Sequence, residues 1–249
     1  MTKLIQNEWL KQTKKKSFWV SAILMALIGV GATVITSMFS DASAGIGVDS
    51  AVSYLSGMMT ASGMGQFATI LSVVGTAGIV AQEYAHGTIK FLLIRSRGRG
   101  EILTSKYIAA LLYTLAMTLV AALSMYIAGG FAFGFGGTGA QWLDALQAGA
   151  YGFVYSLVYV TLTFAIGTLT RSTGVAIGGG LTGTMFGGII IFKDFYKYVL
   201  FPNADLAVYN QIGPPLPGMT IGFSLIVLAV YMALFLVAGY TVFRRRDVA

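Results

Sequence analysis

Residues 83–106 read EYAHGTIKFLLIRSRGRGEILTSK, a polar and basic island that separates two long apolar segments. Apolar segments of this length are typical of membrane helices, so the island is predicted to be a loop that joins two membrane spans. The C-terminal half of the loop carries Arg95, Arg97, Arg99 and Lys106. Because loops rich in Lys and Arg stay on the cytoplasmic side of a membrane, we expect this loop to be cytoplasmic.

A short amphipathic helix is predicted within this loop. Gly87 interrupts the preceding helical segment, and Thr88 directly after it is a suitable N-cap. Ile89, Leu92 and Leu93 then recur at the i, i+3 and i+4 spacing that places apolar side chains on one face of a helix. Such a helix is expected to lie at the membrane interface, where another protein can grip it.

The loop resembles the coupling-helix loop of type-2 ABC transporter permeases, most closely that of the small bacterial members associated with export of, or immunity to, peptide antibiotics. The likeness is carried by Glu83, Tyr84, Gly87, Thr88, Leu92, Leu93 and Arg95. The layout of six predicted spans extends it along the whole chain. One departure is Ile94, which follows the Leu pair where many members of that family have Pro.

The resemblance implies that the loop docks into a groove of a separate cytoplasmic ATP-binding subunit. Two copies of that subunit would bind ATP and Mg and serve a pair of permeases, the second being another copy of this chain or a paralogue. His86 and Lys90 are also predicted to contact that subunit. The alternative for His86 is that it is an exposed loop residue without such a contact. Glu83 is expected either to take part in coupling or to pair locally with Arg95 or Arg97.

The composition is that of an integral membrane protein. Hydrophobic residues make up 56% of the chain and charged residues only 10%, whereas soluble domains are about 25% charged. The absence of cysteine excludes disulfides and thiolate metal sites. The net charge of +7 is spread over the ends of the predicted spans, so it fits anionic lipids and a cytoplasmic partner better than nucleic acid.

The expected fold is an all-α polytopic membrane protein with a single permease domain over residues 1–249. A two-residue turn at Arg171 and Ser172 is expected to make the fourth and fifth spans antiparallel neighbours. The intervals 40–63 and 131–147 are predicted to be outer loops. The six transmembrane helices are predicted at residues 17–39, 65–82, 107–130, 148–170, 174–192 and 220–243.

Two further segments are predicted to lie along the membrane surface. Residues 1–16 are expected to form an interfacial elbow helix with Trp9 at headgroup level, a frayed basic tail being the alternative. Residues 193–219 are rich in aromatic residues and contain all 4 prolines of the chain. They are expected to form a helix or a re-entrant hairpin at the outer interface before the last span.

The distribution of basic residues predicts the orientation of the chain. Of the 16 Lys and Arg residues, only Lys193 and Lys197 fall on the predicted outer side. The positive-inside rule therefore places both termini in the cytoplasm, and we expect a multi-pass protein of the bacterial plasma membrane.

Glycines in the fifth predicted span indicate close helix packing. Gly174 and Gly178 are four residues apart, and Gly179, Gly183 and Gly187 repeat the same spacing. Small residues at this spacing let another helix approach closely within a membrane. The partner is either a helix of the same chain or a second copy.

Chemistry within the membrane is not expected, because no Asp, Glu, Lys, Arg or His falls inside the six spans as drawn. Ion-coupled carriers and intramembrane enzymes need such groups at membrane depth. The one histidine cannot complete an HExxH zinc site, and the chain has no GxxxxGK[ST] loop for a nucleotide. We therefore expect no catalytic residue, cofactor or metal site in this chain.

These features together predict the permease subunit of an ATP-driven ABC exporter that moves a hydrophobic or amphipathic compound outward, such as a peptide antibiotic, a toxin or a drug. The ATPase activity is expected in the partner subunit. The alternative is a membrane scaffold or sensor that recruits a cytoplasmic partner without transporting anything.

Overall fold

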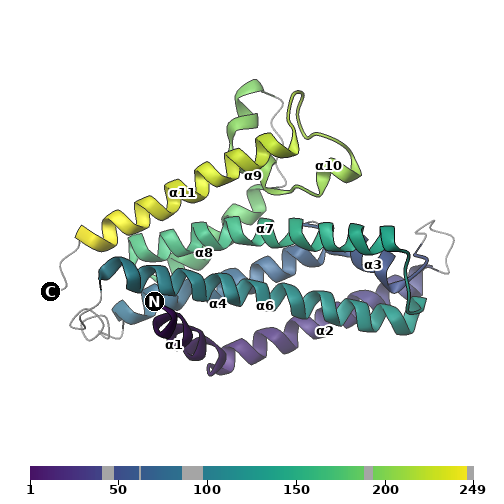
Figure 1. The fold of residues 1–249 in the computed structure, drawn as a ribbon, viewed down its shortest axis with the longest axis horizontal. Coiled ribbons are helices and arrows are strands. Elements are labelled where there is room, and N and C mark those ends of the chain that lie inside the picture. Colours follow the sequence, from purple (N-terminus) through teal and green to yellow (C-terminus); the bar gives the residue numbers. More distant parts are fainter. Residues whose placement is uncertain (41–47, 62, 86–97, 188–192, 246–249) are drawn as a thin grey trace.

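The computed structural model describes residues 1–40, 48–61, 63–85, 98–187 and 193–245, and these residues are helical with no strand among them (Figure 1). Five of the helices are long and apolar enough to cross a membrane. They are α2 (Lys16–Ser40), α4 (Met64–Ala85), α6 (Arg99–Phe133), α7 (Gly139–Thr170) and α11 (Ile221–Arg245). The chain is thus an all-helical, multi-pass membrane protein, as its composition predicts.

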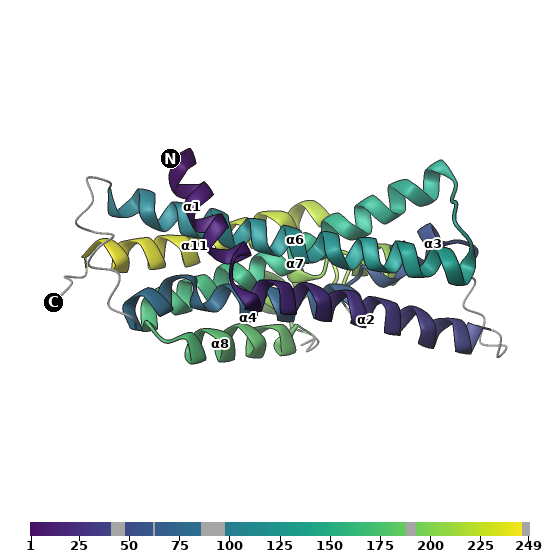
Figure 2. The same cartoon turned by 90° about the horizontal axis from the view of Figure 1, so that it is seen from below.

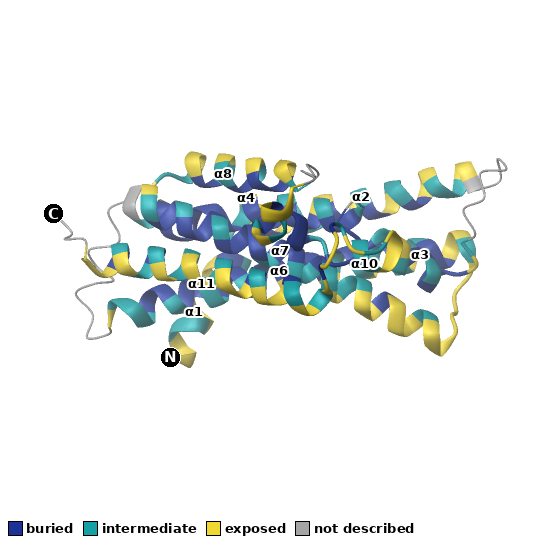
Figure 3. Ribbon diagram, turned by 90° about the horizontal axis from the view of Figure 1, so that it is seen from above, coloured by how far each residue is buried: buried dark blue, intermediate teal, exposed yellow. Residues whose placement is uncertain are grey.

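The centre of the bundle is the seam between α4 and α7, which pack along each other and are the most deeply buried spans (Figure 3). In this seam the hydroxyl groups of Thr69 and Ser156 lie 2.7 Å apart. Helix α6 packs against both, and a Cβ atom at Gly75 of α4 would collide with the ring of Tyr113 on α6. Small and hydroxyl-bearing residues therefore let the three helices approach closely.

The outer helices show their apolar faces to the surroundings. Helix α2 packs mainly on α6, whereas α11 packs mainly on α7, so the two flank the bundle on opposite sides (Figure 1). Large apolar side chains of both helices are more than half exposed, including those of Leu27 and Val237. Such surfaces are expected of helices that contact lipid.

One end of the bundle gathers basic residues, and we call it the basic end. It carries α1 (Thr2–Thr13), the last turn of α4, the first turns of α6, Arg171 and the end of α11 (Figure 1). The guanidinium group of Arg99 donates to the backbone carbonyl of Arg244 over 3.1 Å, which joins the start of α6 to the end of α11. We call the opposite end, which holds α3 (Ala51–Met58) and the connection from α6 to α7, the distal end.

The loop predicted at residues 83–106 is shorter than drawn, because α4 continues to Ala85 and α6 begins at Arg99. Gly98 occupies the N-cap position of α6, and Glu101 in the first turn complements the positive end of the helix dipole. Residues 86–97, which include the predicted amphipathic helix, lie outside the described residues.

Both intervals predicted as outer loops contain helix. In the first, Ser50 caps α3, accepting a hydrogen bond from the backbone N–H of Ser53. In the second, Thr138 and Gln141 form a capping box that starts α7 nine residues before the predicted span. The glycine, serine and aspartate content that favours loops is here outweighed by caps and by burial of α3 against α6 and α7.

The fifth predicted span corresponds in part to α8 (Thr173–Phe186), which follows α7 after the two-residue turn as predicted. Arg171 in this turn adopts a left-handed conformation with φ of 58°. Helix α8 has 14 residues, whereas about 20 are needed to cross the hydrocarbon core. Residues 188–192 lie outside the described part of the chain, so the sixth crossing stays a prediction.

Residues 193–219 form three short helical turns, η1 (Asp194–Tyr198), α9 (Leu200–Ala204) and α10 (Val208–Gln211). Asn203 fastens them to α11. Its side-chain amide donates to the carbonyls of Lys197 at 2.8 Å and Val199 at 2.7 Å, and its oxygen accepts from the hydroxyl of Ser224 at 2.7 Å. Because Asn203 and Ser224 are fully buried, this network fixes the segment on the start of α11.

We expect Asn203→Ala to lower the free energy of unfolding by about 2–4 kcal/mol, because it removes three hydrogen bonds and leaves buried groups without partners. Denaturant titration of the detergent-solubilised protein measures this. The control Asn210→Ala, at an exposed position, should change the value by less than about 0.5 kcal/mol. Equal effects of the two substitutions would contradict the role of Asn203.

Candidate functional site

Four charged side chains from α1, α4 and α6 meet at the basic end. The ammonium group of Lys106 donates to Glu8 Oε2 at 2.9 Å and to Glu83 Oε1 at 2.6 Å. Lys11 Nζ lies 2.8 Å from Glu8 Oε1 and 3.4 Å from Glu83 Oε1. We call Glu8, Lys11, Glu83 and Lys106 the ion cluster.

The helices place these groups by simple periodicity. Glu8 and Lys11 are three residues apart, on the side of α1 that packs against α6. Glu83 lies in the last turn of α4, and Lys106 lies two turns inside α6. Ile102 precedes Lys106 by four residues on the same buried face, so the helix itself directs Lys106 inward.

Aromatic packing beside the ion cluster also holds α1. The ring of Trp9 on α1 contacts Phe18 of α2 edge to face at a centroid distance of 5.9 Å. Phe18 in turn contacts Tyr113 of α6 at 5.4 Å. Helix α1 is therefore attached to the bundle by an apolar contact and an ionic one. That α1 lies at the membrane interface stays a prediction.

Three of the four side chains of the ion cluster are largely buried. The side chain of Lys106 is 0% exposed, those of Glu8 and Glu83 are 7% and 15% exposed, and that of Lys11 is 49% exposed. The two carboxylates and two ammonium groups balance in formal charge. Because an unpaired buried charge costs several kcal/mol, Lys106 depends on both carboxylates.

The pKa values of the α1 groups reflect this pairing. Burial alone would raise the pKa of Glu8, but attraction by Lys106 and hydrogen bonds from Lys11 and Lys106 outweigh it, so the pKa lies below the ordinary value. Burial alone would lower the pKa of Lys11, but its bonds to the two carboxylates raise it. Both groups are thus charged at neutral pH.

Lys15 lies at the edge of the ion cluster, where its ammonium group donates to Gln82 Oε1 at 3.1 Å. Burial and repulsion by Lys106 lower the pKa of Lys15. A second contact thus joins the N-terminal segment to the end of α4.

The structure brings only part of the predicted contact surface into view. Glu83 belongs to the ion cluster, and Tyr84 lies in the last turn of α4. The possible partners Arg95 and Arg97 of Glu83 lie outside the described residues. So do the remaining predicted contact residues, His86, Gly87, Thr88, Lys90, Leu92 and Leu93.

The sequence prediction missed Glu8, Lys11 and Lys106 as members of a site. It began the third span directly after Lys106, whereas α6 begins at Arg99 and includes Lys106 as a buried residue. The signal was available, since the buried positions Ile102, Lys106, Ala109 and Tyr113 follow one helical face.

The predicted packing glycines divide into two groups. Gly179 and Gly183 face α7, where added Cβ atoms would lie 2.5 Å from Ile166 and 3.1 Å from Leu162, and Gly187 at the end of α8 lies close to Tyr159. These three serve contacts within the chain. Gly174 and Gly178 are exposed, so contact with a second copy stays open for them.

The sequence matches one protein family and two proteins of one bacterium. A family model described as "Protein of unknown function (DUF2705)" matches residues 18–249. The chain is 33% identical over 203 residues to "Uncharacterized protein YhcI" of Bacillus subtilis (strain 168), which covers 72% of this chain and 64% of that protein. It is 28% identical over 194 residues to "Uncharacterized membrane protein YdbK" of the same organism, covering 72% and 76%. The chain therefore spans less than two thirds of the length of the first relative.

We expect Lys106→Met to lower the free energy of unfolding by about 3–5 kcal/mol, because it leaves the buried Glu8 and Glu83 with only the half-exposed Lys11 as a cation. The control Lys11→Met, at the half-exposed edge of the ion cluster, should cost no more than about 1 kcal/mol. Denaturant titration in detergent measures both values. A smaller loss for Lys106→Met than for Lys11→Met would contradict the central position of Lys106.

The lowered pKa of Glu8 predicts an acid dependence of stability. Its contribution is present above the unfolded pKa, near 4.5, and is lost as the pH falls through the lower folded pKa. Glu8→Gln should therefore melt below wild type at pH 7, and the gap should close on acidification. Melting temperatures measured across this pH range test the prediction. A gap that stays constant below pH 4.5 would show that the charge of Glu8 is not its cause.

Proposed function

We propose that the chain, which belongs to the family described as protein of unknown function (DUF2705), is the six-span permease subunit of an ATP-driven ABC exporter. Both termini and the basic end face the cytoplasm of a bacterial cell. Residues 174–192 supply the remaining membrane crossing. Two permeases pair with two cytoplasmic ATP-binding subunits, which hold ATP and Mg.

The observation that carries this proposal is the ion cluster at the stem of the predicted coupling loop. Residues 86–97 connect α4 to α6. Glu83 in the last turn of α4 and Lys106 in the second turn of α6 form an ion pair at 2.6 Å. Glu8 adds α1 to the same cation. The helix ends that flank this loop, which we call the stem of the loop, are therefore joined with α1 by ion pairs.

Such a stem suits the transmission of force. Separating α4 from α6 at this end would break the ion pair of Glu83 and Lys106 and leave buried charges without partners, at a cost of about 3–5 kcal/mol. A push on residues 86–97 by an ATP-binding subunit would thus move α1, α4 and α6 together rather than open the loop. In this mechanism Glu83 is a positioning residue that acts through Lys106. The bundle then shifts between two packings, with energy supplied from outside the chain.

The transported compound is proposed to be hydrophobic or amphipathic, such as a peptide antibiotic, a toxin or a drug. The resemblance of Glu83 and its neighbours to the coupling loops of small bacterial exporters supports this substrate class. The chain itself is proposed to have no catalytic role.

We expect deletion of residues 87–93 to abolish substrate-stimulated ATP hydrolysis by the reconstituted complex, because the contact with the ATP-binding subunit is removed. Glu83→Gln should lower the stimulation about tenfold, because it weakens the stem of the loop. Glu101→Gln is the control, a carboxylate of the same end outside the ion cluster. Membrane insertion of each variant is checked by protease protection.

Unchanged stimulation in the deletion variant would reject the coupling role of the loop. Copurification separates the scaffold or sensor alternative from the permease. A permease brings down an ATP-binding subunit with a strength that depends on nucleotide, whereas a scaffold shows no such dependence.

A further inference from the structure

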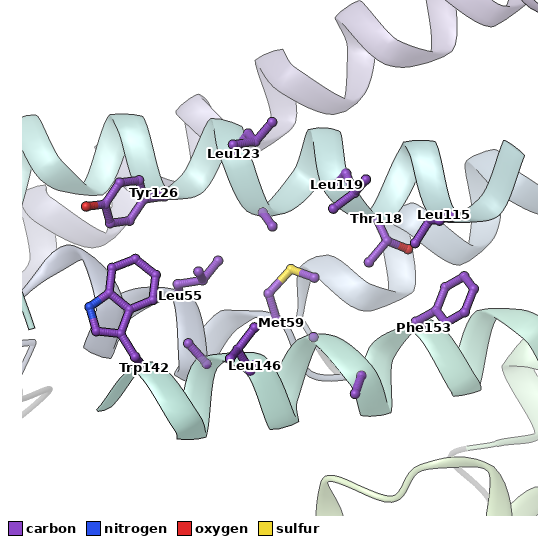
Figure 4. Close-up of a pocket in the computed structure, with 14 residues that line it drawn as sticks. Leu55, Met59, Leu115, Thr118, Leu119, Leu123, Tyr126, Trp142, Leu146 and Phe153 are labelled. Atoms are coloured by element: carbon purple, nitrogen blue, oxygen red, sulfur yellow. The ribbon is translucent and has the colours of Figure 1, made fainter. Parts of the chain in front are cut away.

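The distal halves of α6 and α7 enclose an apolar groove. Helix α7 leans away from α6 over its first turns, and α3 forms the floor of the space between them (Figures 2 and 4). The groove has a volume of about 580 Å³. It is lined by Leu55 of α3 and by Met59 directly after this helix, by Leu115 and Leu123 of α6, and by Phe153 of α7.

The lining is almost entirely hydrocarbon. The hydroxyl of Thr118 already donates to the backbone carbonyl of Thr114 at 3.0 Å, so it offers no free donor. The remaining polar groups are those of Tyr126 and Trp142, whose rings pack at a centroid distance of 5.5 Å at one end of the groove (Figure 4). A polar ligand would lose its hydration without gaining partners, whereas a hydrocarbon would lose nothing.

The length of the groove matches one leaflet of a bilayer. It extends from Tyr126 to Leu115 on α6 and from Trp142 to Phe153 on α7, a rise of eleven residues along each helix. At 1.5 Å per residue this is about 16 Å, roughly half of the 30 Å hydrocarbon core. Tyr and Trp prefer the headgroup level, so their place at the distal end marks the boundary of that leaflet.

The surroundings show from which side the groove is open. Leu123 and Leu146 on its two walls are 59% and 68% exposed, on helices that span the membrane. The opposite face of α7 carries Asp144, Gln147 and Tyr151, which line a polar pocket shared with α10. Helix α7 thus separates a polar side from an apolar side, and the groove belongs to the side that faces lipid.

We propose that this groove is a binding site for one hydrocarbon chain of a phospholipid in the leaflet at the distal end, with the headgroup beyond Tyr126 and Trp142. The bound hydrocarbon chain fills the space between α6 and α7, which the side chains of the described residues leave open. This site is independent of the proposed export function, because it rests on the shape and chemistry of the groove alone.

The test fills the groove and counts retained lipids. Gly149 lines the groove, and a Cβ atom there would meet nothing within 4 Å, so Gly149→Leu directs a side chain into the space from an open position. Gly178→Leu is the matched control, an equally open position on the exposed face of α8. Each protein is reconstituted in vesicles of phosphatidylglycerol and phosphatidylethanolamine, extracted into detergent and examined by native mass spectrometry.

We expect wild type and Gly178→Leu to retain one phospholipid per chain, and Gly149→Leu to retain it in a fraction about tenfold smaller, because several buried CH₂ groups lose their contacts. Ala150→Leu, at another exposed lining position, repeats the test if Gly149→Leu fails to elute as a folded protein. Equal retention by the filled and control variants would overturn the proposal.

A second copy of the chain is the competing occupant. Because the chain contains no cysteine, Leu146→Cys introduces a single thiol on the wall of the groove. Disulfide-linked dimers formed through this thiol in the membrane would show that protein rather than lipid covers the groove, whereas a monomer that retains its phospholipid supports the lipid site.

Discussion

The buried ammonium group of Lys106 is the constraint on which the basic end depends. It is fully enclosed and has carboxylates from two other helices as its partners, at 2.9 Å and 2.6 Å. A buried cation of this kind is tolerated only while its partners stay in place. Its presence therefore dictates that α1, α4 and α6 converge at one point. Helix α1 alone has little apolar surface with which to hold the bundle, since Leu10 is 49% exposed. The ion pair and the contact of Trp9 with Phe18 supply what its own sequence lacks.

Much of the architecture could be predicted from the sequence, because lipid imposes simple rules. The predicted first span at residues 17–39 differs from α2 by one residue at each end, and the turn at Arg171 is where it was expected. Charges and loops were harder. The third span was predicted to begin directly after Lys106, yet Lys106 is neutralised by Glu83 and Glu8, which lie 23 and 98 positions away. Pairing over such separations has no signature in a local window. Similarly, the start of α7 depends on the capping box of Thr138 and on contact with α3, neither of which composition reveals.

The two ends of the molecule are built by different physics. At the basic end, ionic contacts join α1, α4 and α6. At the distal end, α6 and α7 part, and the exposed wall between them is hydrocarbon. The closely packed seam of α4 and α7, with Thr69 and Ser156 in contact, runs between these ends. In the proposed permease, movement would begin at the ion-paired basic end and pass through the tightly packed seam toward the groove.

The central claim is that α1, α4 and α6 move as one unit when a cytoplasmic ATPase acts on the chain. Distances between spin labels test it directly, and the chain lacks native cysteines that would interfere. Three positions are suited to spin labels, namely Gln6 on α1, Gly100 on α6 and Gly178 on α8. Gln6 and Gly178 are exposed, and a Cβ atom at Gly100 or Gly178 would meet nothing within 4 Å. Pulsed electron paramagnetic resonance of the complex with and without ATP should show a constant distance from Gln6 to Gly100 and a changed distance from Gln6 to Gly178. A distance from Gln6 to Gly100 that changes with nucleotide would contradict the claim, because α1 would then part from α6 during the cycle.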